Sequence, residues 1–251
     1  MKGLVIFDVG GVLRDSSLVL WEGYKRGFEV LGLKFGFTER QVWKLRGVGK
    51  YNNGIHGAKA LFAISKTSKK IDEMLRAKDS EELIDKVVEE NVSYEDLVKV
   101  ETIGRIYREF FNSDGAADKI RIFPDAKSSV EKLRKSGYEL AIFSNASKST
   151  IKRDIAALGL DNFAEILAED DIIKKKPSGE GIIKIIYRLN SQLETTYYVG
   201  DAPTDIMAAK DAKCKSIALL TGMGGRKNLE AEKPDLIFDD LTSMTNYLIG
   251  R

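Results

Sequence analysis

The sequence predicts an α/β protein, in which a parallel β-sheet is flanked by helices and an all-helical domain is inserted after the first strand. From residue 120 onward, short apolar runs alternate with helix-length segments, which is the pattern of βαβ units. Residues 15–118, in contrast, show helical patterns and almost no strand pattern. The apolar run at residues 3–9 precedes this helical block, so its strand partners must come from the C-terminal half.

The same contrast sets the expected domain boundaries. Residues 112–115 (Asn-Ser-Asp-Gly) are rich in residue types that interrupt helices, and the first of the four prolines, Pro124, follows soon after. We therefore expect one domain made of residues 1–14 and 119–251 and a helical domain made of residues 15–118.

The helical block carries its own start signals. Thr38–Gln41 resembles a capping box, and Asp79 precedes a second run with apolar residues at helical spacing. A third helical stretch begins at Ser93. Trp21 and Trp43 lie among apolar neighbours at helical spacing, so we expect them in the core of this domain.

The C-terminal half predicts alternating strands and helices. A helix begins near Pro124 and ends before Gly137, and Gly159 ends the next one. The expected strands are residues 139–143, 165–167, 196–199, 216–219 and 235–237, and the later helices are residues 148–158, 179–189 and 204–212 and a final C-terminal helix.

The composition is that of a folded globular protein, with 43% hydrophobic and 31% charged residues. Lys and Arg (40) almost balance Asp and Glu (38), so the net charge is +2 and nucleic acid is not an expected partner. The longest apolar runs fall short of the roughly 18 residues of a membrane span, and residues 4–7 are too short for a signal peptide. We expect a soluble cytoplasmic protein, monomeric or homodimeric, with no membrane partner.

Cysteine and histidine occur once each. Cys214 alone forms no internal disulfide or cysteine-based zinc cluster, and we expect it to be a partly buried packing residue. His56 is interpreted as an exposed or structural residue, with a contact to substrate as the alternative. The glycine- and asparagine-rich residues 46–54 are either a connecting loop or a loop that selects the substrate.

Polar side chains follow the predicted strands at their carboxyl ends, where open α/β sheets bind ligands. Each has a structural alternative, as a turn residue or helix cap or, for the lysine, as part of a solvated loop. These polar residues are Asp8, Ser144, Asn145, Lys176, Asp201 and Asp205.

Their chemistry points to phosphoryl transfer. Three carboxylates at one sheet edge would repel each other unless a cation joined them, and oxygen ligands suit a hard ion such as Mg²⁺. A lysine and a hydroxyl group complement the charge of a phosphoryl group. A central carboxylate can act as the nucleophile and form an acyl phosphate.

Four ordered motifs resemble the haloacid dehalogenase-like hydrolase superfamily. They are Phe7–Leu13 (FDVGGVL), Phe143–Asn145 (FSN), Lys176-Pro177 and Gly200–Asp205 (GDAPTD). The resemblance covers residues 1–14 and 119–251 and implies a Rossmann-like core. The helical insert is similar to the α-helical cap that closes over the site in one subgroup.

The resemblance implies a Mg²⁺ site. Asp8 would attack phosphorus and also bind the metal, and Gly10 would supply a backbone carbonyl to it. Asp201 and Asp205 would hold the metal directly or through water, with Asp201 as the preferred direct ligand.

The resemblance also implies a phosphate site. Ser144, Asn145 and Lys176 would hold the phosphoryl oxygens of a small phosphorylated substrate, and Lys176 would also neutralise Asp8. Lys174-Lys175 compete for the lysine role, but Pro177 favours Lys176 because the family lysine directly precedes proline.

One departure from the family pattern concerns acid–base chemistry. Phosphatases of this superfamily carry D-x-D, whose second aspartate protonates the leaving group and later activates water, whereas this chain has Gly10. Since such groups contribute about 10²–10⁴-fold, we expect slower turnover unless Asp15, an acid of the substrate or a cap residue replaces it.

The leading hypothesis is a Mg²⁺-dependent phosphomonoesterase acting on a small phosphorylated metabolite through an aspartyl-phosphate on Asp8. A dehalogenase would leave Asp201 and Asp205 unexplained, and a phosphonatase would need a cap lysine that forms a Schiff base. A mutase would need the acid that is missing at Gly10. A non-catalytic binding module that retains the fold is the remaining alternative.

Overall fold

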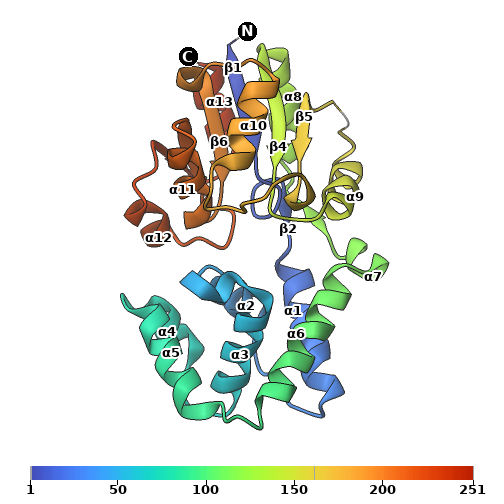
Figure 1. Cartoon of the computed structure of the whole chain (residues 1–251), viewed down its shortest axis with the longest axis vertical. Helices are drawn as coiled ribbons and strands as arrows, with labels where there is room; N and C mark the ends of the chain where they lie inside the picture. The colour runs from blue at the N-terminus through green and yellow to red at the C-terminus, as the bar shows by residue number, and fades with distance from the viewer. Residues whose placement is uncertain (1, 161, 251) are drawn as a thin grey trace. The chain divides into compact units, whose positions relative to one another are not determined.

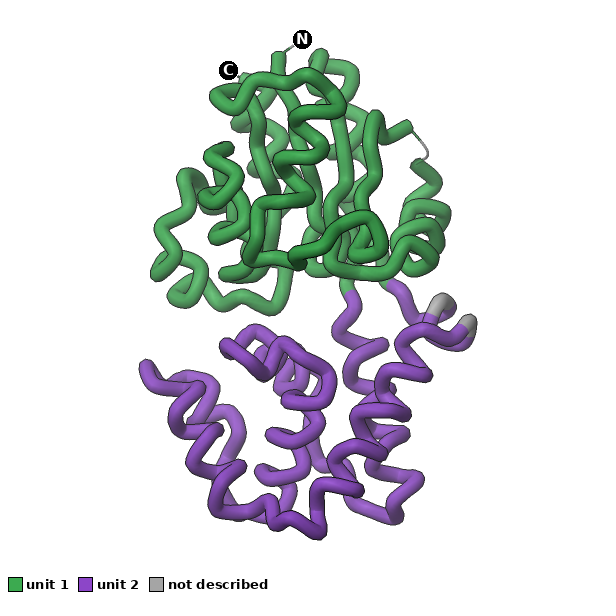
Figure 2. Tube along the Cα trace, in the orientation of Figure 1, with its two compact units in different colours: residues 1–15, 121–251 green, residues 16–120 purple. Residues whose placement is uncertain are grey.

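The computed structural model describes residues 2–160 and 162–250 of the chain. The chain folds into two compact units, drawn in different colours in Figure 2. Residues up to Asp15 and from Arg121 onward form the sheet unit, and Ser16–Ile120 form the helical unit. The sequence placed the two boundaries after residues 14 and 118. In the structure they lie after residues 15 and 120, one and two residues further along the chain.

The described part of the sheet unit is built on six parallel strands in the order β5-β4-β1-β6-β7-β8, so the predicted α/β fold is confirmed (Figure 1). A short antiparallel pair, β2 with β3, joins the two places where the chain leaves and re-enters this unit. The strands are β1 (Gly3–Phe7), β2 (Arg14–Asp15), β3 (Arg121–Ile122), β4 (Tyr138–Phe143), β5 (Glu165–Leu167), β6 (Thr196–Gly200), β7 (Lys215–Leu219) and β8 (Leu236–Phe238).

Both faces of the sheet are buried, as the apolar runs predicted. Val5 and Phe7 of β1 point to a core shared with α8, α9 and α13, and Leu4 and Ile6 point to a core shared with α10 and α11. Figure 1 shows α10 on one side of the sheet and α8 and α13 on the other. Each large apolar side chain buried here contributes about 1.5–3 kcal/mol of transfer free energy.

The helices of the sheet unit follow the expected order, with a short additional helix, α12, that the sequence pattern did not reveal. Gly159 ends α9 with a left-handed φ of 62°, as predicted for a helix stop. The helices are α8 (Ala126–Lys135), α9 (Lys148–Leu158), η2 (Glu169–Asp171), α10 (Glu180–Arg188), η3 (Leu193–Thr195), α11 (Pro203–Asp211), α12 (Arg226–Ala231) and α13 (Leu241–Ile249).

The helical unit has a separate apolar core. Tyr24 and Tyr107 stack at its centre with ring centroids 4.3 Å apart. Its described elements are all helical: α1 (Ser17–Val30), α2 (Glu39–Arg46), η1 (Gly49–Asn52), α3 (Gly54–Ser65), α4 (Ile71–Arg76), α5 (Ser80–Asn91), α6 (Leu97–Phe111) and α7 (Asp114–Ala117).

The structure confirms the predicted start of one helix in this unit but not the predicted burial of its tryptophans. Thr38 and Gln41 form the predicted capping box of α2. Trp21 and Trp43, however, were expected in the core and instead lie half-buried against its edge. The indole of Trp21 donates a hydrogen bond to the carbonyl of Phe37 at 2.7 Å, which keeps its polar end near the surface. Within the described residues, each helix is too short or too polar to cross a membrane.

Candidate active site

Three buried carboxylates converge at the carboxyl edge of the sheet. Phe7 of β1 is in register with Ile142 of β4 and Val199 of β6, so the residues that follow these strands emerge side by side. Asp8 follows β1, Asp201 follows β6, and Asp205 lies in the first turn of α11. One oxygen from each of the three carboxylates lies within 4.8 Å of the other two.

Lys176 is the cation of this cluster. Its Nζ lies 3.1 Å from Asp8 Oδ1 and donates a hydrogen bond to Asp205 Oδ1 at 2.6 Å. Its two neighbours in the lysine run lie elsewhere: Lys175 pairs with Glu169, and Lys174 is exposed. Geometry therefore favours Lys176 over both alternatives.

Asp205 organises the loop around it as well as the lysine. Its Oδ2 accepts the backbone N–H groups of Asp201 and Ala202 at 3.0 and 2.9 Å, as an acid in the first turn of a helix does. Its Oδ1 is occupied by Lys176. Both oxygens therefore have partners, which makes Asp201 the more available direct ligand of a metal.

Asp201 is held by the loop after β7. The backbone N–H of Met223 donates to Asp201 Oδ2 at 2.8 Å, and that of Gly224 donates to the Asp201 carbonyl at 3.1 Å. A Cβ on Gly222 would lie 1.9 Å from Asp201 Oδ2, and one on Gly11, whose φ is +74°, would lie 2.4 Å from the same oxygen. Glycine is required at both positions because the carboxylate occupies that space.

The electrostatics of the cluster are unbalanced. Burial and repulsion from Asp205 and Asp8 hold the pKa of Asp201 well above its ordinary value, and burial also raises that of Asp205 despite Lys176. Burial alone would lower the pKa of Lys176, but attraction to Asp205 and Asp8 outweighs it. When ionised, three carboxylates and one ammonium leave a buried charge of −2.

This donor set fits a hard divalent cation such as Mg²⁺. All candidate ligands are oxygens, and the surplus charge matches that of the ion. Asp8 Oδ1 is buried and has the Lys176 ammonium 3.1 Å away, but it accepts no hydrogen bond from the residues that the structure describes, so it can still act as a metal ligand.

The two residues after β4 differ in their contacts. Ser144 is buried, and its Oγ accepts the N–H of Ala146 at 3.4 Å. Asn145 makes two hydrogen bonds to the main chain of Lys176: its Oδ1 accepts the Lys176 N–H at 3.0 Å, and its Nδ2 donates to the Lys176 carbonyl at 3.4 Å. Neither residue caps α9, because Ser147 does.

Two observations bear on the glycine that stands in place of the second aspartate. Gly10 forms a single β-bridge to Arg14. Asp15, a candidate to replace the missing acid, pairs through its carboxylate with Arg121 at 2.7 Å. That ion pair joins β2 to β3, so the Asp15 carboxylate has a structural role.

The residues of the 46–54 segment that the sequence singled out lie within the helical unit. Arg46 is buried and donates to the hydroxyl of Tyr24 at 3.0 Å, and Lys50 pairs with Asp85 at 2.7 Å. His56 is exposed, with Nδ1 3.2 Å from the Lys50 carbonyl, and borders a cavity of about 250 Å³.

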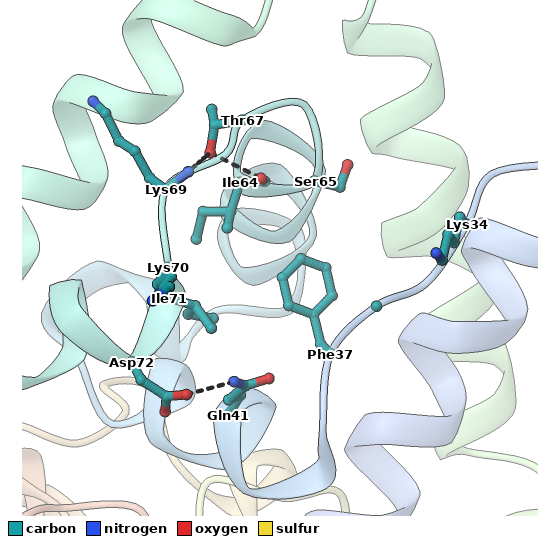
Figure 3. Close-up of a pocket in the computed structure, with 11 residues that line it drawn as sticks. Lys34, Phe37, Gln41, Ile64, Ser65, Thr67, Lys69, Lys70, Ile71 and Asp72 are labelled. Atoms are coloured by element: carbon teal, nitrogen blue, oxygen red, sulfur yellow. Dashed lines mark hydrogen bonds between the residues drawn. The ribbon is translucent and has the colours of Figure 1, made fainter.

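A second cavity of the helical unit, about 350 Å³, lies between α2, α3 and α4 (Figure 3). The Nε2 of Gln41 donates to Asp72 at 2.7 Å across one side of it, and Phe37 contributes an aromatic wall. Three exposed lysines line it, two of which pair with glutamates outside it. It contains no cluster of acids like that of the sheet unit among the described residues.

Sequence reasoning missed Tyr198. This residue lies in β6, three positions before Asp201, and is buried. Its hydroxyl accepts a hydrogen bond from Lys176 Nζ at 2.9 Å and donates one to the Phe143 carbonyl at 2.9 Å. Burial raises its pKa well above the ordinary value, so the phenol keeps its proton. Tyr198 lies within an apolar strand pattern, which gives no local signal of a contact with Lys176.

Comparison with known proteins identifies relatives of the chain. A family model described as haloacid dehalogenase-like hydrolase matches residues 5–219. The pyrophosphatase PpaX of Bacillus mycoides is 29% identical over 154 residues, which are 61% of this chain and 71% of that protein.

Solved structures share the fold. A putative phosphoglycolate phosphatase from Lactobacillus delbrueckii subsp. bulgaricus superposes with a TM-score of 0.74 at 20% identity, over 100% of this chain and 99% of that one. A putative beta-phosphoglucomutase from Thermotoga maritima gives 0.64 at 19% identity, over 98% of each chain.

Proposed function

The chain belongs to the haloacid dehalogenase-like hydrolase family, and we propose that it is a Mg²⁺-dependent phosphomonoesterase for a small phosphorylated metabolite, with Asp8 as nucleophile. Its relative PpaX is named a pyrophosphatase, which agrees with phosphoryl transfer in this chain. The observation that carries the proposal is the buried cluster of three carboxylates beside Lys176, with its surplus of negative charge.

In the first half-reaction, an oxygen of Asp8 attacks phosphorus and the bond from phosphorus to the leaving oxygen breaks. The leaving group departs with the electron pair of that bond and takes up a proton. Lys176, 3.1 Å from Asp8, neutralises charge on the nucleophile and on the phosphoryl oxygens. In the second half-reaction, water attacks the same phosphorus and loses a proton to solvent, and the bond from phosphorus to the Asp8 oxygen breaks, which releases phosphate and the Asp8 carboxylate.

The remaining residues would orient the reactants. A bound Mg²⁺ would supply positive charge to the phosphoryl group. Asp8, the backbone carbonyl of Gly10 and Asp201 would bind the ion directly, and Asp205 would bind it through water. Ser144 would donate its hydroxyl proton to a phosphoryl oxygen, since its Oγ already accepts the Ala146 N–H. Asn145 would act mainly by fixing the Lys176 main chain.

We propose that the helical unit is the cap of this enzyme and contributes the contacts that select the substrate. The charged residues of its 46–54 segment are the first candidates, although Arg46 and Lys50 already have partners within the unit. Release of a halide needs no metal, so it would leave the surplus negative charge of the carboxylate cluster unexplained. Phosphate monoesters are therefore the better candidate substrates.

The test is phosphate release from para-nitrophenyl phosphate with and without Mg²⁺. Wild-type protein should require the metal, and Asp8→Asn should be inactive. Equal activity in the wild type and in Asp8→Asn would end the proposal.

The missing acid at Gly10 is tested separately with phosphate esters of graded leaving-group pKa. Without a general acid, kcat/KM, which reports the first half-reaction, should rise steeply as the leaving group becomes more acidic. Gly10→Asp should flatten this dependence, and Gly10→Asn, which matches its size but offers no acid, should not. A flat dependence in the wild type would show that another residue donates the proton.

A further inference from the structure

The hydroxyl of Tyr198 occupies a position between two catalytic segments. It lies in β6 and reaches the ammonium of Lys176 at 2.9 Å on one side and the carbonyl of Phe143 at 2.9 Å on the other. Phe143 is the last residue of β4 and directly precedes Ser144. The hydroxyl therefore joins the lysine loop to the end of the strand that presents the serine.

The ammonium of Lys176 has three polar partners. Its ammonium donates to Asp205 and to Tyr198 and lies 3.1 Å from Asp8. The rings of Phe143 and Tyr198 are close to it as well, with centroids 5.7 and 5.5 Å from Nζ. The lysine side chain is 4% exposed, so water has little access to replace a lost partner.

The carboxylates of Asp205 and Asp8 both lie beside the ammonium, so electrostatic attraction alone would let it move between them. A neutral acceptor on a rigid central strand removes that freedom, because a hydrogen bond is directional in a way that charge attraction is not. Asn145 fixes the main chain of the lysine in a comparable way. Backbone and side-chain end of Lys176 are thus held by different residues.

We propose that Tyr198 is a positioning residue, which holds the Lys176 ammonium in line with Asp8 through its hydroxyl. This inference rests on the proposed phosphoryl-transfer function, in which Lys176 stabilises the charge that develops on the phosphoryl group. Tyr198 itself touches neither the substrate nor the metal in this role.

The test compares Tyr198→Phe with Tyr138→Phe. Both variants remove one buried phenol hydroxyl from the sheet unit, since that of Tyr138 donates to the Leu248 carbonyl at 3.0 Å. Both should lose some stability. Only Tyr198→Phe should lower kcat for para-nitrophenyl phosphate, by about 10- to 100-fold, with KM within about two-fold. The reason is that a misplaced Lys176 would stabilise the transition state less well, whereas binding of the substrate would change little.

A second readout does not depend on activity. The ¹⁵N-labelled side-chain ammonium of Lys176, assigned by its loss in Lys176→Arg, should give a sharp NMR signal in wild-type protein and in Tyr138→Phe. In Tyr198→Phe the signal should broaden or shift, because one of its acceptors is gone. If Tyr198→Phe does not fold, 3-fluorotyrosine at position 198 weakens the acceptor while keeping its shape, and the same changes should appear with smaller size.

The outcomes separate the two proposals. A wild type without phosphatase activity but with the predicted lysine signal would overturn the proposed function and leave the contact supported. An active wild type in which Tyr198→Phe keeps the kcat of Tyr138→Phe and an unchanged lysine signal would overturn the positioning role.

Discussion

The sheet unit buries two ionic clusters, one around Asp8 and one around Asp154, and they differ in charge balance. Asp154 of α9 is fully buried, with Arg14 Nε 2.7 Å from one oxygen and Arg153 Nε 3.5 Å from the other. Burial raises the pKa of Asp154, and the two guanidinium groups act against that rise. The cluster around Asp8 instead sets three carboxylates against one lysine.

This difference separates a structural cluster from a candidate site. In the Asp154 cluster the protein itself offsets the buried carboxylate, through the buried Arg14 and the partly exposed Arg153, and the Arg14 pair joins β2 to α9. The Asp8 cluster, when ionised, carries surplus negative charge that no described residue offsets, so a bound cation could complete it. Burial of charge alone does not indicate function; the sign and size of the imbalance do.

The largest expected effect is on catalysis. Asp8→Asn should lower kcat by about 10⁴-fold or more, because the nucleophile itself is lost. The free energy of unfolding should stay the same or increase, since a repelled carboxylate is removed. Steady-state kinetics with para-nitrophenyl phosphate and urea denaturation measure the two quantities. A large loss of stability would mean that Asp8 is structural, like Asp154.

Removing the carboxylate of the Asp154 cluster should instead lower stability. Asp154→Ala should reduce the free energy of unfolding by about 3–5 kcal/mol, because it leaves Arg14 buried without its charge partner. The folded fraction should keep wild-type KM. Replacing both members, as in Arg14→Met with Asp154→Leu, should recover part of the stability. A loss below about 1 kcal/mol from Asp154→Ala would remove the contrast between the clusters.

The order of helices and strands in the sheet unit was predictable from sequence because apolar runs and helix stops are local signals. The carboxylates and the serine were predicted because they come just after strands, and parallel strands place their ends at one edge. Lys176 was favoured because it directly precedes Pro177, as the resemblance to the family implies. The choice among Lys174, Lys175 and Lys176 needed the structure, since it depends on which side chain turns inward. The roles of Tyr198 and Asn145 were missed because each depends on a contact between distant segments.

A smaller effect is expected where the Asp201 carboxylate is held. Gly222→Ala should weaken Mg²⁺ binding by about 10- to 100-fold, because its Cβ would lie 1.9 Å from Asp201 Oδ2 and must displace it. Gly225→Ala is the matched control in the same loop, since a Cβ there has no neighbour within 4 Å. Equal Mg²⁺ affinities in the two variants would show that this carboxylate does not bind the ion.

The smallest effect concerns the pH dependence of stability. The pKa of Asp201 is raised above its ordinary value of 3.8 in the folded, metal-free protein, by burial and by repulsion from Asp205 and Asp8. Its ionisation as the pH rises therefore favours the unfolded state, fully so above the raised pKa. Metal-free Asp201→Asn should melt a few degrees above wild type at pH 8, and this gap should close as the pH falls towards 4. A gap independent of pH would contradict this account of the cluster.

The most direct test of the central claim is calorimetric titration of the protein with Mg²⁺ at pH 8. If the Asp8 cluster is completed by a divalent cation, wild-type protein and Asp154→Asn should each bind one ion per chain, and Asp201→Asn should bind it at least ten-fold more weakly. Absence of binding in the wild type, or equal affinity in Asp201→Asn, would contradict the claim.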